Sequence, residues 1–373
     1  MNCFVPTLIA WQRRHGRHDL PWQANRDPYR VWLSEIMLQQ TQVAAVVPYF
    51  ERFVARFPDV HALARAPLNE VLRLWSGLGY YARARNLHRA ARRVSEEFGG
   101  RFPDTREALC ALPGVGRSTA AAIAAFCFGR REAILDGNVK RLFARCFGVE
   151  GYSGEAAVAA RLWSLAESLL PRRAIEVYTQ ALMDLGATVC TRARPHCERC
   201  PLRAQCVALR EDRVTALPAP RPRRARPLRR EIWLVALHGK RVLLERRPAH
   251  GLWGGLWVMP RLAKADDLAD AARRALGAKP VRTRMRTPFE HGFTHFRLHV
   301  RPLECDYAKA PARRPPRSRW ISLAQAAHAA VPAPVARLLR ALLSERSARP
   351  VRPVPRLAVQ GVRRRRRSRA APA

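Results

Sequence analysis

Residues 112–138 combine a turn that can bind a phosphate with a carboxylate that could take part in catalysis. The turn contains Gly114 and Gly116, and glycines at this spacing permit positive φ and close approach by another backbone. Their amides, with those of the helical turn that follows, form a site for an anion. Asp136 follows at the far end of an Ala-rich helix. Such a module suits chemistry on a nucleic-acid backbone, although the pattern fits equally well a helix closed by glycine and an Asp N-cap.

Four cysteines lie within seventeen residues at the spacing C-x6-C-x2-C-x5-C. They are Cys190, Cys197, Cys200 and Cys206. Thiolates this close together can enclose a [4Fe–4S] cluster or a tetrahedral zinc ion. Zinc knuckles more often contain two CxxC pairs, and only one is present here, so we favour iron–sulfur over zinc, and zinc over a metal-free loop. Four cysteine ligands leave no open position, so either metal would hold a loop together and would not perform hydrolysis.

The composition indicates a polyanionic partner. The formal net charge is +39, from 68 basic and 29 acidic residues, and only five of the basic residues are lysine. This excess favours nucleic acid over an anionic membrane surface, although an Arg-rich bias can also reflect a GC-rich genome. No apolar run approaches the length of a membrane span, and the N-terminus runs directly into a helical pattern. We therefore expect a cytoplasmic, nucleoid-associated bacterial protein.

The apolar pattern divides the chain into two domains and two polar segments. Residues 1–206 repeat apolar side chains every three or four positions, which predicts a nearly all-helical domain that includes the cysteines. Residues 207–230 are rich in proline and arginine and predict an extended linker. Residues 231–345 predict a smaller α+β domain. The Arg-rich residues 346–373 predict a disordered tail.

Individual elements can be placed within these domains. The helical domain should contain a helix–hairpin–helix at 105–128, followed by helices near 138–147 and 155–186. In the second domain a hairpin is expected around residues 238–240. The other expected elements are strands near 281–287 and 295–303 and helices near 266–276, 322–329 and 333–345.

Several of these motifs together resemble a known superfamily. The hairpin LPGVGRSTA, the downstream LDGNVKR and the cysteine spacing are similar to those of the endonuclease III superfamily of DNA glycosylases. Within it, WLSEIMLQQTQV (32–43), LWSGLGYYARARNL (74–87) and MDLGATVC (183–190) resemble the MutY-type adenine DNA glycosylases. The resemblance covers residues 4–206 strongly and 230–345 more weakly.

The resemblance implies a fold and a reaction. The expected fold is a mainly α helix-hairpin-helix glycosylase domain with an iron–sulfur loop, followed by a smaller α+β Nudix-like domain. The expected enzyme is a base-excision repair N-glycosylase that flips adenine out of the duplex and hydrolyses its glycosidic bond. The adenine would be one mispaired with 8-oxoguanine or guanine. We expect a monomer, with duplex DNA as its partner and a [4Fe–4S] cluster as its cofactor.

The resemblance also assigns the two carboxylates that glycosidic cleavage needs. Glu35 matches the family's acid, which protonates the leaving base, and Asp136 matches the carboxylate that stabilises the oxocarbenium-like sugar. The neighbours of Glu35 in WLSEIM are mostly apolar, which predicts a raised pKa and a protonated carboxyl. Taken alone, Glu35 would be interpreted as a surface glutamate and Asp136 as a helix cap. The cap and the catalytic role are compatible.

Further positions match those with which the family contacts DNA. Ser118 stands where bifunctional relatives have a lysine that forms a Schiff base, and a serine hydroxyl cannot form one, so we expect a monofunctional enzyme. Gln180 matches a position that helps to hold the flipped adenine. The other expected DNA contacts are Gln40, Thr41, Leu78 and Tyr80, which would invade the duplex, and Gly114, Gly116, Ser118 and Asn138. Helix packing and an exposed loop aromatic are the alternatives for the invading residues.

The second domain resembles the family's 8-oxoguanine-reading domain. Its motif here is Phe293-Thr294-His295, where the family usually has Phe-Ser-His, and threonine keeps the hydroxyl. There is no glutamate between Arg247 and Phe289, so a Nudix magnesium site and nucleotide hydrolysis are not expected.

Two other functions fit parts of the pattern. One is a bifunctional, endonuclease III-like glycosylase and AP lyase for oxidised pyrimidines, against which Ser118 and the second domain argue. The other is a catalytically silent DNA-binding protein, in which Glu35 or Asp136 would be replaced, and both are present.

Overall fold

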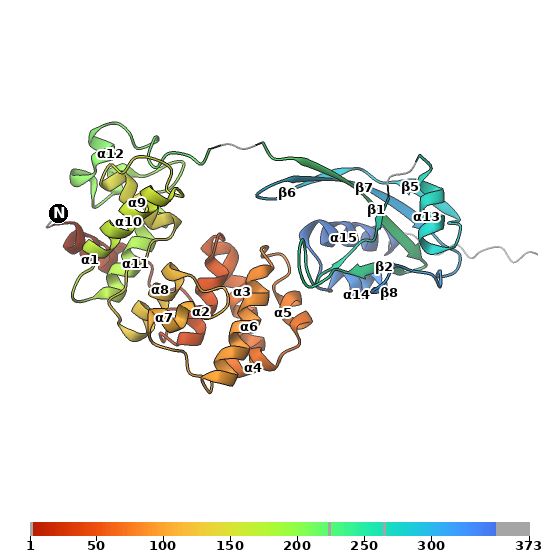
Figure 1. Ribbon diagram of the computed structural model, residues 1–373, viewed down its shortest axis with the longest axis horizontal. Helices are drawn as coiled ribbons and strands as arrows, with labels where there is room; N and C mark the ends of the chain where they lie inside the picture. The colour runs from red at the N-terminus through yellow and green to blue at the C-terminus, as the bar shows by residue number, and fades with distance from the viewer. Residues whose placement is uncertain (1–2, 223–224, 264–265, 348–373) are drawn as a thin grey trace, which may run out of the picture.

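The computed structural model describes residues 3–222, 225–263 and 266–347 (Figure 1). A helical part and a part built on a β-sheet lie side by side, and a long connecting segment joins them. The expected disordered tail lies outside the described residues from position 348 onward. None of the described helices is long and apolar enough to cross a membrane.

The helical part is made of short helices, several of which begin at an acidic or hydroxyl side chain that accepts a backbone N–H. Asp27, Asp59, Thr105 and Asp136 all act as N-caps in this way, each satisfying an amide that has no partner within its helix. The helices are α1 (Phe4–His15), α2 (Pro28–Leu38), α3 (Val43–Arg56), α4 (Val60–Arg65), α5 (Leu68–Leu74), α6 (Ala82–Glu97), α7 (Arg106–Cys110), α8 (Arg117–Phe128), α9 (Gly137–Cys146), α10 (Ala156–Ser168), α11 (Ile175–Asp184) and α12 (Val207–Arg210).

The single helix predicted at 155–186 is wrong. The chain forms two helices there, α10 and α11, with a π-helical turn, η1 (Leu185–Val189), after the second. The break contains Pro171, which lacks the N–H that a continuing helix needs. Ala174 then adopts a left-handed conformation, with φ 55°, before α11 begins.

Helix α8 separates the two hydrophobic cores of the helical part. Ala120, Ile123 and Ala124 belong to one core, which also contains α2 to α6, whereas Ala121 and Ala122 belong to the other, which contains α1, α9, α10 and α11. Residues 120–125 are fully buried, and five of the six are alanine, whose small side chains allow the flanking helices to approach closely. The alanine-rich sequence of α8 is therefore a packing requirement.

The C-terminal part is an eight-stranded sheet covered on both faces. Its order is β3-β2-β1-β7-β5, with β4, β6 and β8 pairing with β1, β7 and β2. Among the strand pairs of the described residues, β1 and β7 alone run parallel. The strands are β1 (Leu228–His238), β2 (Arg241–Arg246), β3 (Trp257–Val258), β4 (Arg261–Leu262), β5 (Arg282–Met285), β6 (Phe289–Gly292), β7 (Arg297–Asp306) and β8 (Ser318–Ser322), and the helices are α13 (Leu268–Leu276), α14 (Leu323–Ala327) and α15 (Ala333–Ser347).

The run of apolar residues in β1 follows from this two-sided burial. Trp233, Val235 and Leu237 pack toward α14 and α15, whereas Leu234 and Ala236 pack toward α13. A strand buried on both faces shows no polar alternation.

The segment predicted to be an extended linker is partly folded. It begins with α12, and Ala208 and Leu217 are buried. Arg145, itself buried in α9, donates a hydrogen bond of 2.9 Å from Nε to the carbonyl of Leu217. The first half of the segment therefore packs on the cysteine-containing end of the helical part.

The two parts are joined by direct contacts as well as by the connecting segment. The carbonyl of Val331 accepts hydrogen bonds from Ser76 Oγ at 2.9 Å and from the Tyr81 hydroxyl at 3.0 Å. Arg85 donates to the carbonyl of Gly254 at 2.9 Å. Leu256 of the C-terminal part belongs to the core that contains α2 to α6. The loops beside the sheet are thus fixed against the start of α6.

Candidate active site

Glu35 and Asp136 reach the same place from opposite sides of α8. Glu35 lies on α2, which packs on α8, and Asp136 caps α9 in the second core. Burial and the negative charge of Asp136 raise the pKa of Glu35 to about 8. The two carboxylates are therefore close enough to interact, and Glu35 holds its proton at neutral pH.

Of the carboxylates of Glu35 and Asp136, Asp136 is the one that acts as the negative charge. Burial raises the pKa of Asp136, but the Val139 amide at 2.8 Å and the Asn138 amide at 3.0 Å both donate to Oδ1 and oppose this effect. The Asn138 side-chain amide and the cationic Arg141 oppose it as well. The Glu35 carboxylate accepts no hydrogen bond within the described residues. When the two carboxylates hold a single proton between them, that proton is therefore on Glu35.

A cavity of about 370 Å³ opens beside Glu35. This volume is within the usual range for small-molecule sites, and the walls combine aromatic and aliphatic side chains with a few polar groups. The residues that line it include Trp22, Val31, Glu35, Leu38, Phe126, Gln180 and Met183.

Gln180 is held in place by a buried acid that sequence reasoning missed. Its Nε2 donates to Asp184 Oδ1 at 2.8 Å, which leaves the Gln180 carbonyl oxygen available to a ligand in the cavity. Asp184 is completely buried and is also paired with Arg17, whose Nε donates to Oδ1 at 2.7 Å. An acidic residue on the mostly apolar helix α11 indicates that a cationic or hydrogen-bonding side chain is buried beside it, because acids are rarely buried unpaired. The sequence does not identify Arg17 as that side chain.

Two strained turns, residues 39–41 and 77–80, lie between Glu35 and Asp136 along the chain. Gln40 and Tyr80 both adopt left-handed backbone conformations, with φ values of 58° and 47°. Gln40 is exposed and Tyr80 is 50 % exposed, so both can contact a ligand outside the protein. Thr41 is half-buried and Leu78 is buried. Non-glycine residues hold such conformations only when the surroundings enforce them.

Arg83, which sequence reasoning also missed, connects the two strained turns. Its guanidinium donates to the carbonyls of Met37 at 2.7 Å and Gln39 at 2.5 Å and to Thr41 Oγ1 at 3.1 Å on one side. On the other side it donates to the carbonyls of Leu78 at 3.3 Å and Gly79 at 3.4 Å. Burial lowers the pKa of Arg83 to about 10, so the cation persists at neutral pH.

The hairpin before α8 contains a left-handed backbone conformation that glycine adopts without strain. Gly114 has φ +83°, and a Cβ there would lie 2.8 Å from Cβ of Asn86. Gly116 is the N-cap of α8 and faces open space, as an anion site requires. The Ser118 hydroxyl accepts the Leu135 N–H at 3.0 Å and so fixes the residue that precedes Asp136.

The four predicted cysteine ligands line one small cavity together with a fifth cysteine, Cys146. Hydrogen bonding with Cys146 lowers the pKa of Cys206 to about 6, and Arg145 Nη1 lies 3.4 Å from Cys190 Sγ. Among the described residues no three His, Cys, Asp or Glu side chains form a group that could hold a metal ion. The donor set is nonetheless entirely sulfur, with an arginine to balance thiolate charge, which fits an iron–sulfur cluster.

The predicted lesion motif lies in the turn between β6 and β7 and does not line the Glu35 cavity. Phe293 is half-buried and packs against Trp253, with ring centroids 5.5 Å apart, and stacks on Phe296 at 4.4 Å. Thr294 and His295 are exposed. The structure thus brings Glu35 and Asp136 together, and Ser118 fixes the chain just before Asp136. Gln180 lines the same cavity as Glu35. The cysteines and the lesion motif lie outside this cavity.

Comparison with known proteins agrees with this division. Residues 33–168 match the family of HhH-GPD superfamily base excision DNA repair proteins, and residues 232–341 match the NUDIX domain. The chain is 33 % identical over 338 residues to an adenine DNA glycosylase of Buchnera aphidicola, covering 90 % of this chain and 96 % of the relative. It is 35 % identical to the adenine DNA glycosylase of Mus musculus, covering 89 % and 76 %. A thermostable thymine-DNA glycosylase structure aligns with a TM-score of 0.51 and 31 % identity, covering 56 % of this chain and 96 % of that one.

The Glu35 carboxyl should titrate near pH 8, which carbon-13 NMR of labelled glutamate can measure. Asp136→Asn should lower that pKa while leaving it above the ordinary value of 4.5, because burial remains when the neighbouring charge is removed. A Glu35 pKa unchanged by Asp136→Asn would contradict the interaction between the two carboxylates.

The raised pKa also predicts a pH-dependent stability. Because the folded-state pKa lies above the unfolded one, the wild-type protein loses stability as pH rises from about 4.5 to about 8. Glu35→Gln lacks this loss, so its melting temperature relative to wild type should increase through that window and level off above it. The control is Glu70→Gln, at a surface ion pair on α5.

Arg83→Met should release both strained turns. Loss of the buried donors leaves several carbonyls unpaired, which should cost about 2–4 kcal/mol of unfolding free energy. Hydrogen exchange should become faster at residues 39–41 and 77–80. The matched control is Arg92→Met, on the same helix and in an exposed pair with Glu96. Equal exchange in both variants would show that Arg83 does not order the turns.

Proposed function

The chain belongs to the adenine DNA glycosylase family, and we propose that the adenine it excises is mispaired with 8-oxoguanine or guanine in duplex DNA. It is thus a base-excision repair N-glycosylase with a C-terminal Nudix domain. The proposal rests above all on Glu35, which keeps its proton at neutral pH and lines a cavity of about 370 Å³, with Asp136 near enough for its charge to raise the pKa of Glu35. We further propose that it acts as a monomer on cytoplasmic, nucleoid DNA.

The proposed reaction divides the work between the carboxylates. The flipped adenine enters the Glu35 cavity, where the Gln180 carbonyl can accept a hydrogen bond from the exocyclic amino group. Glu35 donates its proton to a ring nitrogen, so that the base leaves as a neutral group. Asp136 stabilises the positive charge that develops on the sugar, and water completes the hydrolysis.

We propose that the enzyme is monofunctional. The Ser118 hydroxyl accepts the Leu135 N–H, and a hydroxyl cannot form the Schiff base that a lyase reaction needs. Borohydride treatment during adenine release should therefore trap no covalent protein–DNA complex. Efficient trapping would favour the oxidised-pyrimidine glycosylase/lyase alternative.

The proposed DNA contacts lie on the strained turns and the hairpin. Gln40, Thr41, Leu78 and Tyr80 would enter the duplex around the mispair, and Arg83 would hold their turns in one arrangement. The amides of Gly114, Gly116 and Ser118 would bind a backbone phosphate, with Asn138 adjacent at the start of α9. Such contacts position the duplex without reading its sequence.

The proposed reader of the base opposite adenine is Phe293-Thr294-His295. His295 is exposed, so His295→Ala should leave the fold intact. A lost base contact is worth roughly 1–3 kcal/mol, so the preference for 8-oxoguanine:adenine over guanine:adenine should fall about tenfold. This preference is measured as the ratio of single-turnover excision rates on the two duplexes at matched salt. The control is His250→Ala, another exposed histidine of the same domain. An unchanged preference would exclude His295 as the reader.

We propose that Cys190, Cys197, Cys200 and Cys206 hold a [4Fe–4S] cluster. When bound, such a cluster ties its loop together and offers no open position for hydrolysis. Arg141 connects this loop to the catalytic region, because it donates to the Cys190 carbonyl at 2.8 Å and to Asn138 Oδ1 at 2.9 Å.

Cys200→Ser should remove the cluster, measured as loss of bound iron and of the absorbance near 400 nm expected of such clusters. Cys110→Ser, at a half-buried cysteine elsewhere in the helical part, is the matched control and should keep both. Stoichiometric zinc in colourless, anaerobically purified wild-type protein would contradict the cluster assignment.

A further inference from the structure

One buried hydroxyl group joins the strained turn at residues 77–80 to the C-terminal part. The Tyr81 hydroxyl accepts the backbone N–H of Gly77 at 3.3 Å and donates to the carbonyl of Val331 at 3.0 Å. The Ser76 hydroxyl donates to the same carbonyl at 2.9 Å. The residues on both sides of the turn that carries Tyr80 are therefore held by one backbone oxygen of the other part.

The Val331 carbonyl lies where the chain passes between the hydrophobic cores of the two parts. Ala330 is buried in the core that contains α2 to α6, whereas Val331 is buried in the core of the C-terminal part. The Ala330 carbonyl accepts the Trp257 N–H of β3 at 2.9 Å. Helix α15 begins two residues after Val331. The carbonyl is thus fixed by a strand on one side and by a helix on the other.

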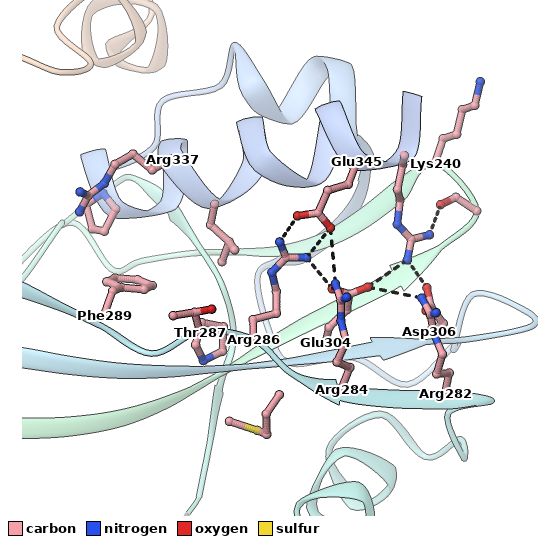
Figure 2. Close-up of a pocket in the computed structure, with 16 residues that line it drawn as sticks. Lys240, Arg282, Arg284, Arg286, Thr287, Phe289, Glu304, Asp306, Arg337 and Glu345 are labelled. Carbon is pink, nitrogen blue, oxygen red and sulfur yellow. Dashed lines mark hydrogen bonds and ion pairs between the residues drawn. The ribbon is translucent and has the colours of Figure 1, made fainter. Parts of the chain in front are cut away.

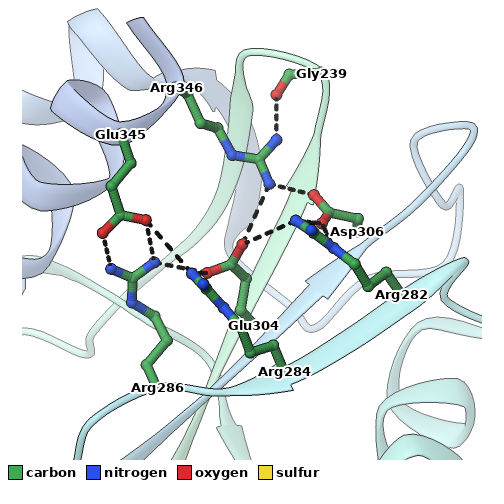
Figure 3. Close-up of polar contacts among 8 residues, drawn as sticks. All are labelled: Gly239, Arg282, Arg284, Arg286, Glu304, Asp306, Glu345 and Arg346. Atoms are coloured by element: carbon green, nitrogen blue, oxygen red, sulfur yellow. Dashed lines mark hydrogen bonds and ion pairs between the residues drawn. The ribbon is translucent and has the colours of Figure 1, made fainter. Parts of the chain in front are cut away.

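Helix α15 is itself fastened to the sheet. Figure 2 shows α15 lying over the sheet, with Glu345 directed at Arg286. Figure 3 shows that Arg346, the next residue of the helix, pairs with Asp306 of β7. The buried Glu304 joins the two pairs, because it accepts a hydrogen bond from Arg286 at 2.7 Å and also pairs with Arg346. Together with the apolar face of the helix, these ion pairs hold α15 in place.

A second connection between the two parts runs through the loop at residues 251–257. The ring of Trp253 packs against the cores of both parts and lies 5.5 Å from the Phe293 ring of the lesion motif, measured between ring centroids. Leu256 is fully buried in the core that contains α2 to α6. The Gly254 carbonyl accepts a hydrogen bond from Arg85 of α6 at 2.9 Å. The same loop therefore contacts the lesion motif and the helix that follows the strained turn.

These contacts connect two exposed groups that belong to different parts of the protein. Tyr80 is exposed on the turn, and His295 is exposed in the lesion motif. Two binding groups held at a fixed spacing act at a high effective concentration for each other, which a flexible tether provides only in part. Contact of one group with a ligand can then assist contact of the other.

From this arrangement we infer that Ser76 and Tyr81 are positioning residues, which hold the duplex-invading turn at a fixed spacing from the lesion motif. Reading of the base opposite adenine then assists entry of Tyr80 into the duplex, and the preference for 8-oxoguanine reaches the helical part through these contacts. Neither Ser76 nor Tyr81 lines the Glu35 cavity, so both act through the turn. The inference rests on the proposed function, in which the turn and Phe293-Thr294-His295 both contact DNA.

Hydrogen exchange of the free, full-length protein tests the connection without DNA. Leu256→Ala leaves a cavity where the C-terminal part packs on the helical part, and exchange at residues 77–80 should become at least about fivefold faster. The matched control is Leu276→Ala, at a buried leucine of α13 on the other face of the sheet, which should leave exchange at the turn unchanged. Slow exchange at the turn in Leu256→Ala, or equal acceleration by both variants, would overturn the inference.

Excision rates test whether the two hydroxyl groups carry the preference. Ser76→Ala combined with Tyr81→Phe removes both donors to the Val331 carbonyl. The ratio of single-turnover rates on 8-oxoguanine:adenine and guanine:adenine duplexes should fall at least about fivefold, the lower end of typical coupling between two sites. The control is Tyr29→Phe, which removes another buried hydrogen bond of the helical part, 2.7 Å long, to the carbonyl of Phe57. A ratio as high as that of the control would contradict the positioning role.

A double-mutant cycle with His295→Ala separates positioning of the turn from a general loss of structure. In the Ser76→Ala/Tyr81→Phe background, His295→Ala should lower the ratio less than it does in the wild-type protein, because reading of the base is no longer passed to the turn. Equal effects in both backgrounds would show that the two sites act independently and would overturn the inference. If His295→Ala alone left the ratio unchanged, the proposed reader would be wrong, and the exchange experiment would still confirm or overturn the contact between the parts.

Discussion

Two carboxylates buried close together resist being ionised at the same time at neutral pH, and the fold of the helical part decides which of them keeps its proton. Asp136 receives the amides that open α9, whereas Glu35 lies on α2 without a donor among the described residues. The difference between an acid and a stabilising anion therefore comes from local backbone geometry, because the two side chains have the same chemistry. This geometry requires α2 and the core that contains α9 to lie on opposite sides of α8, which the buried alanines of α8 permit.

The sequence predicted the features that depend on residue type and spacing. The helical class, the sheet domain, the family and the enzyme type are confirmed. The raised pKa of Glu35 was predicted from its apolar neighbours and agrees with the structure. The site residues and domain boundaries remain predictions. The long helix at 155–186 was wrong because periodicity continues across a break that Pro171 and the left-handed Ala174 impose.

What the sequence did not reveal are side chains that act through contacts between distant segments. Arg83 donates hydrogen bonds to carbonyls more than forty positions earlier in the sequence. Asp184 pairs with Arg17, which lies 167 positions earlier. Their partners are backbone carbonyls or residues remote in sequence, and neither kind leaves a local pattern. Cys146 was missed for the same reason, because it joins the cysteine cavity from α9 and not from the cysteine loop.

These contacts also change how the net charge of +39 should be interpreted. Arg83, Arg141 and Arg145 direct their guanidinium groups at carbonyl oxygens inside the protein, where five donors per side chain can join several loops at once. Lysine, with three donors on a compact ammonium group, could not replace them in this role. Part of the arginine excess therefore serves the fold, and only the arginines whose donors face solvent or an open cavity can contribute to attracting a polyanion. The salt dependence of DNA binding should accordingly be smaller than the total charge alone would imply, because counterion release counts only charges that meet phosphates.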